Sequence, residues 1–260
     1  MRITKYTVFT DKKGIDFKAA VVSDLHARPY KDAISALAAI SPDIILLPGD
    51  IVEIATEYMS ERNKNGLAFL KECVNIAPTY YCHGNHEIYF SHAKFGKSKT
   101  PDKVMNEEYA DLIASYGVNI VNDDFLKANL KNGSEILIGG LVCGRDKDPN
   151  LNAPTPNVEF LTEFDAKIEY KILLCHYPHL YEKYLKDTSF DLILSGHAHG
   201  GQWRLLNRGV FAPHQGLFPK YTSGIYDNRH IISRGVANNV KPIPRLFNPC
   251  EVLEINVNNK

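Results

Sequence analysis

The sequence predicts an α/β protein, because short apolar runs of strand length alternate with amphipathic helical patterns along its 260 residues. The apolar runs are nearly continuous and rich in β-branched residues, as in strands that are buried on both faces. We therefore expect a substantial central sheet. The predicted strands span residues 19–22, 44–47, 79–82, 136–138, 172–175, 192–194, 231–232 and 252–257.

Helical patterns separate several of these runs. Residues 33–40, 66–76 and 104–116 repeat apolar side chains at intervals of three or four, and Ser41-Pro42 ends the first pattern. A short helix is predicted from Pro178 to Leu185, because proline suits the first helical turn. After Gly200, prolines and glycines become frequent and predict loops and hairpins. Since no repeat or linker interrupts the chain, we predict one domain over residues 1–260.

Composition and charge exclude several classes of protein. Lys plus Arg number 30 and Asp plus Glu number 30, so the net charge is zero and argues against a dedicated nucleic-acid-binding protein. The longest apolar stretch, residues 136–144, is far shorter than the ~20 residues of a membrane span. Charges recur within residues 1–20, so we expect neither a signal peptide nor a transmembrane segment. The five cysteines are scattered and form no CxxC pair, which favours a reducing, cytoplasmic location.

Five of the predicted strands end in Asp, Asn or His. The sequences that follow them are Ser23-Asp24-Leu25-His26, Pro48-Gly49-Asp50, His83-Gly84-Asn85-His86-Glu87, His176, and Ser195-Gly196-His197-Ala198-His199-Gly200. Because ligands of open α/β sheets bind outside the carboxyl ends of the strands, we expect these side chains to converge.

Their chemistry indicates a metal centre. Residues two apart on an extended segment point the same way, as Asp24 and His26 must do to bind one ion, and His197 and His199 repeat this spacing. Mixed carboxylate, imidazole and amide ligands suit Mn, Fe, Zn or Co. Seven candidates are too many for one ion but suit two ions that share a carboxylate. They are Asp24, His26, Asp50, Asn85, His176, His197 and His199.

Taken together, these motifs resemble those of the calcineurin-like metallophosphoesterase superfamily, over residues 17–257. Residues 200–202, 216–221, 233–235 and 244–249 narrow the resemblance to a bacterial phosphodiesterase branch whose members are often membrane-tethered. The resemblance implies a four-layer αββα sandwich with a dinuclear metal site at the carboxyl ends of the strands.

The resemblance also implies a role for each motif residue. Asp24, His26, Asp50 and His199 would hold the first ion, and Asp50, Asn85, His176 and His197 the second, with Asp50 bridging. Two divalent ions, with Mn preferred, would hold a bridging hydroxide that attacks the phosphorus. His86 would act as the catalytic residue that protonates the leaving oxygen, oriented by Glu53 or Glu87. Glu53 stands where the family often has Asp.

The expected function is therefore metal-dependent hydrolysis of phosphate esters, with phosphodiesters as the expected substrates. A phosphomonoesterase and a lipid-linked pyrophosphate hydrolase, of the UDP-diacylglucosamine type, are the alternatives. A non-enzymatic scaffold is disfavoured, because every ligand position is intact. We expect a small-molecule or lipid-like substrate, contacted by Arg145 and Arg234, and peripheral membrane association is compatible with this picture.

Residues outside the motifs receive simpler predictions. His83 is expected to be packed in the core, and His179 to lie at the rim of the site or in solvent. An aromatic-rich stretch is expected to form a satellite core under the C-terminal loops, or else an apolar wall for a lipid-like substrate. It comprises Trp203, Phe211, Phe218, Tyr221 and Tyr226.

Overall fold

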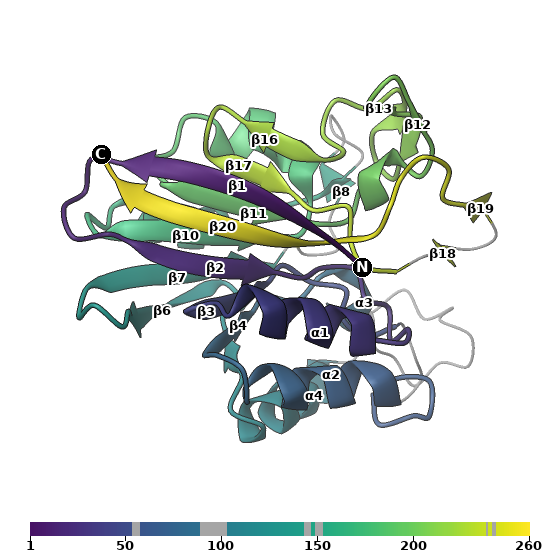
Figure 1. Cartoon of the computed structure of the whole chain (residues 1–260), viewed down its shortest axis with the longest axis horizontal. Helices are drawn as coiled ribbons and strands as arrows, with labels where there is room; N and C mark the ends of the chain where they lie inside the picture. Colours follow the sequence, from purple (N-terminus) through teal and green to yellow (C-terminus); the bar gives the residue numbers. More distant parts are fainter. Residues whose placement is uncertain (54–57, 89–102, 143–146, 149–152, 238, 241–242) are drawn as a thin grey trace.

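Two six-stranded sheets make up most of the protein (Figure 1). The computed structural model describes residues 1–53, 58–88, 103–142, 147–148, 153–237, 239–240 and 243–260. The first sheet has the strand order β1-β20-β2-β3-β4-β5. Its strands are β1 (Arg2–Thr10), β2 (Phe17–Val21), β3 (Ile44–Leu47), β4 (Thr79–Tyr81), β5 (Asn119–Ile120) and β20 (Glu251–Asn259).

The second sheet has the strand order β16-β17-β11-β10-β7-β6. Its four central strands are parallel, and both edge strands, β6 and β16, are antiparallel to their neighbours. The strands are β6 (Asp124–Asn129), β7 (Glu135–Leu141), β10 (Tyr170–Cys175), β11 (Leu192–Ser195), β16 (Gly224–Tyr226) and β17 (His230–Ile232). In the first sheet, β2 to β5 are likewise parallel.

The helices are short. They are α1 (Lys31–Ile40), α2 (Lys64–Cys73), α3 (Asn85–Ile88), α4 (Lys103–Ser115) and α5 (Val158–Asp165), with the 3₁₀ helices η2 (Pro178–Leu180) and η4 (His199–Gly201) and the π-helix η3 (Tyr181–Leu185). Among the described helices, none has both the length and the apolarity needed to cross a membrane.

Alternation along each strand explains the layers. Because successive side chains of a strand point to opposite faces, Ala19 and Val21 of β2 enter a core between the two sheets, whereas Ala20 and Val22 enter a second core under α1, α2 and α4. A third core packs α5 and η3 against the outer face of the second sheet. The layers are therefore helix, sheet, sheet, helix, which confirms the predicted αββα sandwich, and Figure 1 shows α1, α2 and α4 gathered on one side.

Small hairpins follow β11, as the prolines and glycines predicted. The strands are β12 (Arg204–Leu205), β13 (Arg208–Gly209), β14 (Phe211–Ala212), β15 (Gly216–Leu217), β18 (Asn239–Val240) and β19 (Ile243–Pro244), and another pair, β8 (Lys147–Asp148) and β9 (Ala153–Pro154), precedes α5. The parallel strands β2, β3, β4, β10 and β11 direct their carboxyl ends to one edge of the sandwich, where the sequence motifs lie.

Candidate metal centre

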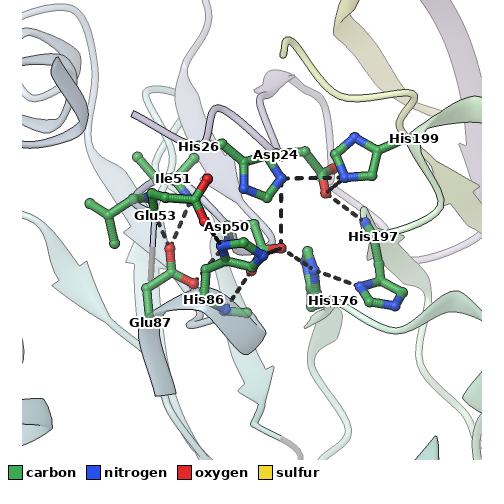
Figure 2. A network of polar contacts seen from close by, with 12 residues as sticks. Asp24, His26, Asp50, Ile51, Glu53, His86, Glu87, His176, His197 and His199 are labelled. Atoms are coloured by element: carbon green, nitrogen blue, oxygen red, sulfur yellow. Dashed lines mark hydrogen bonds and ion pairs between the residues drawn. The ribbon is translucent and has the colours of Figure 1, made fainter. Parts of the chain in front are cut away.

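The motif residues that the sequence singled out come together at this edge (Figure 2). Asp24 and His26 follow β2, and Asp50 follows β3. His176 follows β10 in the second sheet. Asn85 and His86 lie on α3 after β4. His197 lies between β11 and η4, and His199 is the first residue of η4. Both sheets therefore contribute side chains to one cluster.

One group of side chains consists of Asp24, His26 and His199. His199 Nε2 lies 3.4 Å from Asp24 Oδ1 and 3.3 Å from His26 Nε2. All three residues are at most 5% exposed, so these polar atoms face one another away from bulk solvent. The group has the composition of half of a dinuclear site.

A second group consists of Asp50, His176 and His197. His176 Nε2 lies 3.1 Å from Asp50 Oδ2 and 3.2 Å from His197 Nδ1. The same carboxylate oxygen of Asp50 lies 3.9 Å from His26 Nε2 in the first group. Asp50 thus stands between the two groups, where a bridging carboxylate would be needed.

The backbone of the cluster adopts an unfavourable conformation. Asp24, His26, Asp50, His197 and His199 all have positive φ angles, between 45° and 65°. Left-handed backbone at residues other than glycine costs on the order of 1–3 kcal/mol each and gathers at functional sites. The fold therefore accepts strain at the positions that carry the candidate ligands.

Two motif glycines are required by close approach to the carboxylates. A Cβ added to Gly84 would lie 2.3 Å from Asp50 Oδ1, and one added to Gly196 would lie 2.6 Å from Asp24 Oδ2. Any larger residue would displace these carboxylates. This explains why the Asn85-His86 and His197-x-His199 motifs each begin with glycine.

The polar atoms of the cluster fit bound cations. Asp24 Oδ2 and Asn85 Oδ1 are buried and have no hydrogen-bond partner within the described structure. The imidazole nitrogens of two further pairs, His26 with His199 and His176 with His197, face each other at 3.2–3.3 Å. Buried polar atoms are normally satisfied, and a divalent ion would satisfy the convergent carboxylate and imidazole atoms together.

Electrostatics favour the same occupant. Burial lowers the pKa of His26 and of His199 to about 3, with His86 and Arg245 adding to the effect, so both imidazoles are neutral and keep a lone pair. Burial alone would raise the pKa of Asp50, but His176 and His86 hold it well below its usual range. The ionised Asp50 carboxylate and the neutral imidazoles of His26 and His199 attract a cation.

The orientation of His176 is fixed from behind. Its Nδ1 lies 2.7 Å from the carbonyl oxygen of Pro48, and a carbonyl accepts only from an N–H, so Nδ1 is protonated. Burial lowers the pKa of His176, but Asp50 and Asp24 raise it to about 10, so Nε2 also carries a proton toward Asp50 that a cation bound there would displace. A backbone carbonyl that sets the tautomer of a ligating histidine is a common feature of metal sites.

Glu87 binds the backbone of the loop that begins at Asp50, and it is not the glutamate that orients His86. Its buried carboxylate accepts hydrogen bonds from the backbone N–H groups of Asp50, Ile51, Val52 and Gly84, at 2.7–3.1 Å, and from the hydroxyl of Tyr81 at 2.6 Å. Of the two glutamates proposed to orient His86, Glu53 is the one in contact, with Oε1 2.7 Å from His86 Nδ1. Figure 2 shows Glu53 beside His86, and Glu87 joined by dashed contacts to Ile51.

Glu87→Gln should destabilise the metal-free protein by at least about 3 kcal/mol, because an amide group cannot accept at both positions and leaves buried N–H groups unpaired. The free energy of unfolding in urea measures the effect. Glu72→Gln is the matched control, since Glu72 pairs with Lys31 and Tyr30 at the surface and should matter little. An equal loss in both variants would contradict the role given to Glu87.

Arg145 and Arg234 were predicted to contact the substrate, and the structure describes only one of them. Arg145 lies outside the described residues. Arg234 has its Nε 3.7 Å from Glu251 Oε1, a buried carboxylate at the start of β20. Sequence reasoning missed Arg245, whose Nη2 donates to the carbonyl of Arg234 at 2.6 Å and lies 3.4 Å from His199 Nδ1. Only the motif at residues 244–249 signalled it, and no spacing linked that motif to the centre.

Three histidines outside the proposed ligand sets are His83, in the core, and His179 and His214, beside the centre. His83 is buried between Tyr81 and Tyr109, which confirms the core prediction. His179 is buried too, 5.4 Å between ring centroids from His214, so solvent exposure is wrong for it. His214 was missed by sequence reasoning, although its Nδ1 lies 3.0 Å from His197 Nε2.

The aromatic-rich stretch only partly forms a satellite core. Tyr221 is buried and packs against Tyr226, with 4.9 Å between ring centroids. Trp203, Phe211 and Phe218 are 42–69% exposed, so the core prediction is wrong for these three. They lie on the small hairpins, which are too short to cover them.

Comparison with known proteins identifies the family. The family model described as calcineurin-like phosphoesterase matches residues 17–201, which include all five strand-end motifs. The chain belongs to this family. It is therefore a metal-dependent phosphoesterase, a hydrolase of phosphate esters, and the two groups of candidate ligands correspond to a divalent-metal site.

Relatives in three bacteria span most of the chain. An uncharacterized metallophosphoesterase of Aquifex aeolicus is 27% identical, and the alignment spans 100% of this chain and 93% of the relative. Phosphodiesterase YaeI of Escherichia coli is 29% identical, covering 88% and 78%. The uncharacterized metallophosphoesterase YkuE of Bacillus subtilis is 28% identical, covering 91% and 78%.

Proposed function

We propose that this phosphoesterase hydrolyses phosphodiesters with two divalent cations and with His86 as the general acid. The observation that carries the proposal is that one oxygen of Asp50, Oδ2, faces His26 at 3.9 Å, His176 at 3.1 Å and His86 Nε2 at 3.9 Å. A shared carboxylate oxygen with an imidazole beside it is the arrangement that two-metal phosphoester hydrolysis needs.

The ligand sets follow the two groups of side chains. The first cation would be held by Asp24, His26, Asp50 and His199, and the second by Asp50, Asn85, His176 and His197. When bound, the cations would neutralise the phosphoryl oxygens and lower the pKa of an attacking water. Nitrogen and oxygen donors without a thiolate are compatible with Mn, the cation that we propose, and also with Fe, Zn and Co.

His86 is suited to protonate the leaving oxygen. Burial lowers the pKa of His86, but the Asp50 and Glu53 carboxylates outweigh it, so the pKa is raised above its usual value, which favours the protonated ring. Glu53 accepts from His86 Nδ1, and the proton on Nε2 is left facing the centre. The pKa of Glu53, raised by burial but lowered more by His86, falls to about 2, so Glu53 stays ionised.

A diester is favoured over a monoester by charge. Monoester dianions generally require cationic side chains beside the metals, in addition to the ions themselves. Within the described part of the chain, Arg245 lies behind His199 and Arg234 is paired with Glu251. The relative YaeI is named a phosphodiesterase. A monoanionic diester, whose alkoxide leaving group benefits from His86, fits this centre better.

Comparison of two soluble aryl phosphates tests the proposal. With Mn at neutral pH, kcat/KM for a bis-aryl phosphate should exceed that for the mono-aryl phosphate by at least about tenfold. A clear preference for the monoester would overturn the diester assignment and favour a phosphomonoesterase. Faster hydrolysis of a UDP-diacylglucosamine-type pyrophosphate than of either aryl phosphate would favour the lipid-linked alternative.

A further inference from the structure

Six large apolar side chains are 47–91% exposed on the segments that follow the candidate ligand His199. We call them the hairpin surface: Leu205, Leu206, Phe211, Leu217, Phe218 and Phe247. Isolated exposed apolar residues are ordinary, but a group of this size on neighbouring turns marks a binding surface.

Backbone contacts place the segments that carry these residues side by side. Leu205 and Leu206 lie at the turn between β12 and β13, and Phe211 is the cross-strand partner of Leu217. The N–H of Phe218 donates to the carbonyl of Val210 at 2.8 Å, and Trp203 forms a bridge with Leu246, the neighbour of Phe247. Figure 1 shows β12 and β13 at one end of the molecule, away from α1, α2 and α4.

The stretch that carries the hairpin surface is rich in Lys and Arg, of which Arg229, Arg234 and Arg245 are bound to groups away from this surface. Residues 200–249 contain seven lysines and arginines but one aspartate, a formal charge of +6 in a chain whose total is zero. Beside Phe218 is a cavity of about 380 Å³, lined by the cations Arg204, Arg208 and Lys220 and by no carboxylate. Glu182 pairs with Lys220 from outside this lining.

We propose that the hairpin surface docks the enzyme on an anionic phospholipid bilayer, with the leucine and phenylalanine side chains inserted and lipid phosphates in the basic cavity. Apolar side chains surrounded by Lys and Arg are the pattern of proteins that bind the membrane interface. A second copy of the chain is a poor occupant, because two faces of the same charge would meet. Single-stranded nucleic acid is held by stacked aromatic rings and cations, and the oligonucleotide competition described below tests that occupant.

The surface lies beside the metal centre. His214 is on the turn between β14 and β15, the strands of Phe211 and Leu217, and its Nδ1 lies 3.0 Å from His197 Nε2. Asn248, next to Phe247, donates to the carbonyl of His199 at 2.7 Å. Docking would therefore bring the candidate ligands next to the lipid headgroups. Bilayer binding itself does not depend on which phosphoester is hydrolysed.

Co-sedimentation with lipid vesicles tests the proposal. The purified full chain should bind phosphatidylcholine vesicles that contain phosphatidylglycerol, and bind pure phosphatidylcholine vesicles at least about tenfold more weakly. Leu206→Glu and Phe218→Glu should each weaken binding by at least about tenfold, and Arg208→Gln by about fivefold. Ile168→Glu is the matched control, because Ile168 is 89% exposed but lies between α5 and β10, and it should bind like the wild type.

Hydrolysis of a soluble bis-aryl phosphate separates docking from catalysis. All four variants should retain this activity, because none of the altered residues lies in the candidate centre. Failure of the wild type to sediment with phosphatidylglycerol vesicles would overturn the proposal, even if hydrolysis is normal. Equal weakening of vesicle binding by Ile168→Glu would also overturn it. So would release of the protein from the vesicles by an oligonucleotide added at the same phosphate concentration as the lipid. Retained vesicle binding without any phosphodiesterase activity would leave docking intact and contradict the proposed function.

Discussion

Asp50→Asn should reduce kcat/KM by at least about 10³-fold and lower the metal content of the reconstituted protein below one ion per chain. Asp50 Oδ2 faces His26 and His176, so it belongs to both proposed ligand sets, and its Oδ1 accepts the N–H of His86 at 2.9 Å. An amide carries no negative charge and would leave several buried imidazoles beside unneutralised cations. The other six proposed ligands each belong to one set.

Metal analysis together with steady-state kinetics measures this effect. Asp43→Asn is the control, because Asp43 is a partly buried carboxylate that pairs with Lys131 at the amino end of β3, whereas the motifs follow the carboxyl ends of the strands. It should keep two ions and normal turnover. If Asp50→Asn kept two tightly bound ions, Asp50 would not be the bridge, and the assignment of the two sets would be wrong.

His86→Asn should leave the metal content nearly unchanged and lower kcat by about 10²–10⁴-fold, as expected for a general acid. His86 is outside both proposed ligand sets, and its ring lies between Glu53 and the centre. Glu53→Gln should have a smaller effect, about tenfold, and should shift the alkaline limb of the pH profile of kcat to lower pH. The sign follows from the charges, because Glu53 raises the pKa of His86 and its removal lowers the pKa at which the acid is lost.

Substrates with different leaving groups distinguish a general acid from a structural role. A diester with a good leaving group, such as a nitrophenolate, needs less protonation, so His86→Asn should impair it less than a diester with an alkyl leaving group. Equal losses on both substrates would indicate that His86 only shapes the site. Normal turnover of the alkyl diester by His86→Asn would remove it from the mechanism.

Much of the fold was predictable because both faces of the central strands are buried. Strand β3 places Ile44 and Leu46 in one core and Ile45 and Leu47 in another, so its sequence is a continuous apolar run. Strand β1 was missed, since only Val8 and Thr10 of its nine residues are buried and its sequence alternates with charges. Helix α5 was missed because eight residues with Phe160, Leu161 and Phe164 inward are too short for a clear period.

The candidate ligands were predictable for a related reason. Each directly follows a buried strand, and the parallel arrangement brings those ends together. The contacts that orient them were not, because they join residues far apart in the chain. His214 reaches His197 through a hairpin, and Arg245 reaches His199 after more than forty intervening residues. No local pattern records such contacts, whereas the Glu53–His86 pair could be proposed because both residues flank recognisable motifs.

Metal content measured together with activity tests the central claim most directly. After removal of metal by a chelator and reconstitution with Mn, the chain should contain two ions, and hydrolysis of a bis-aryl phosphate should disappear and return with them. Two results together would contradict the dinuclear account: the protein holds only traces of metal after reconstitution, and it keeps full activity in the presence of chelator.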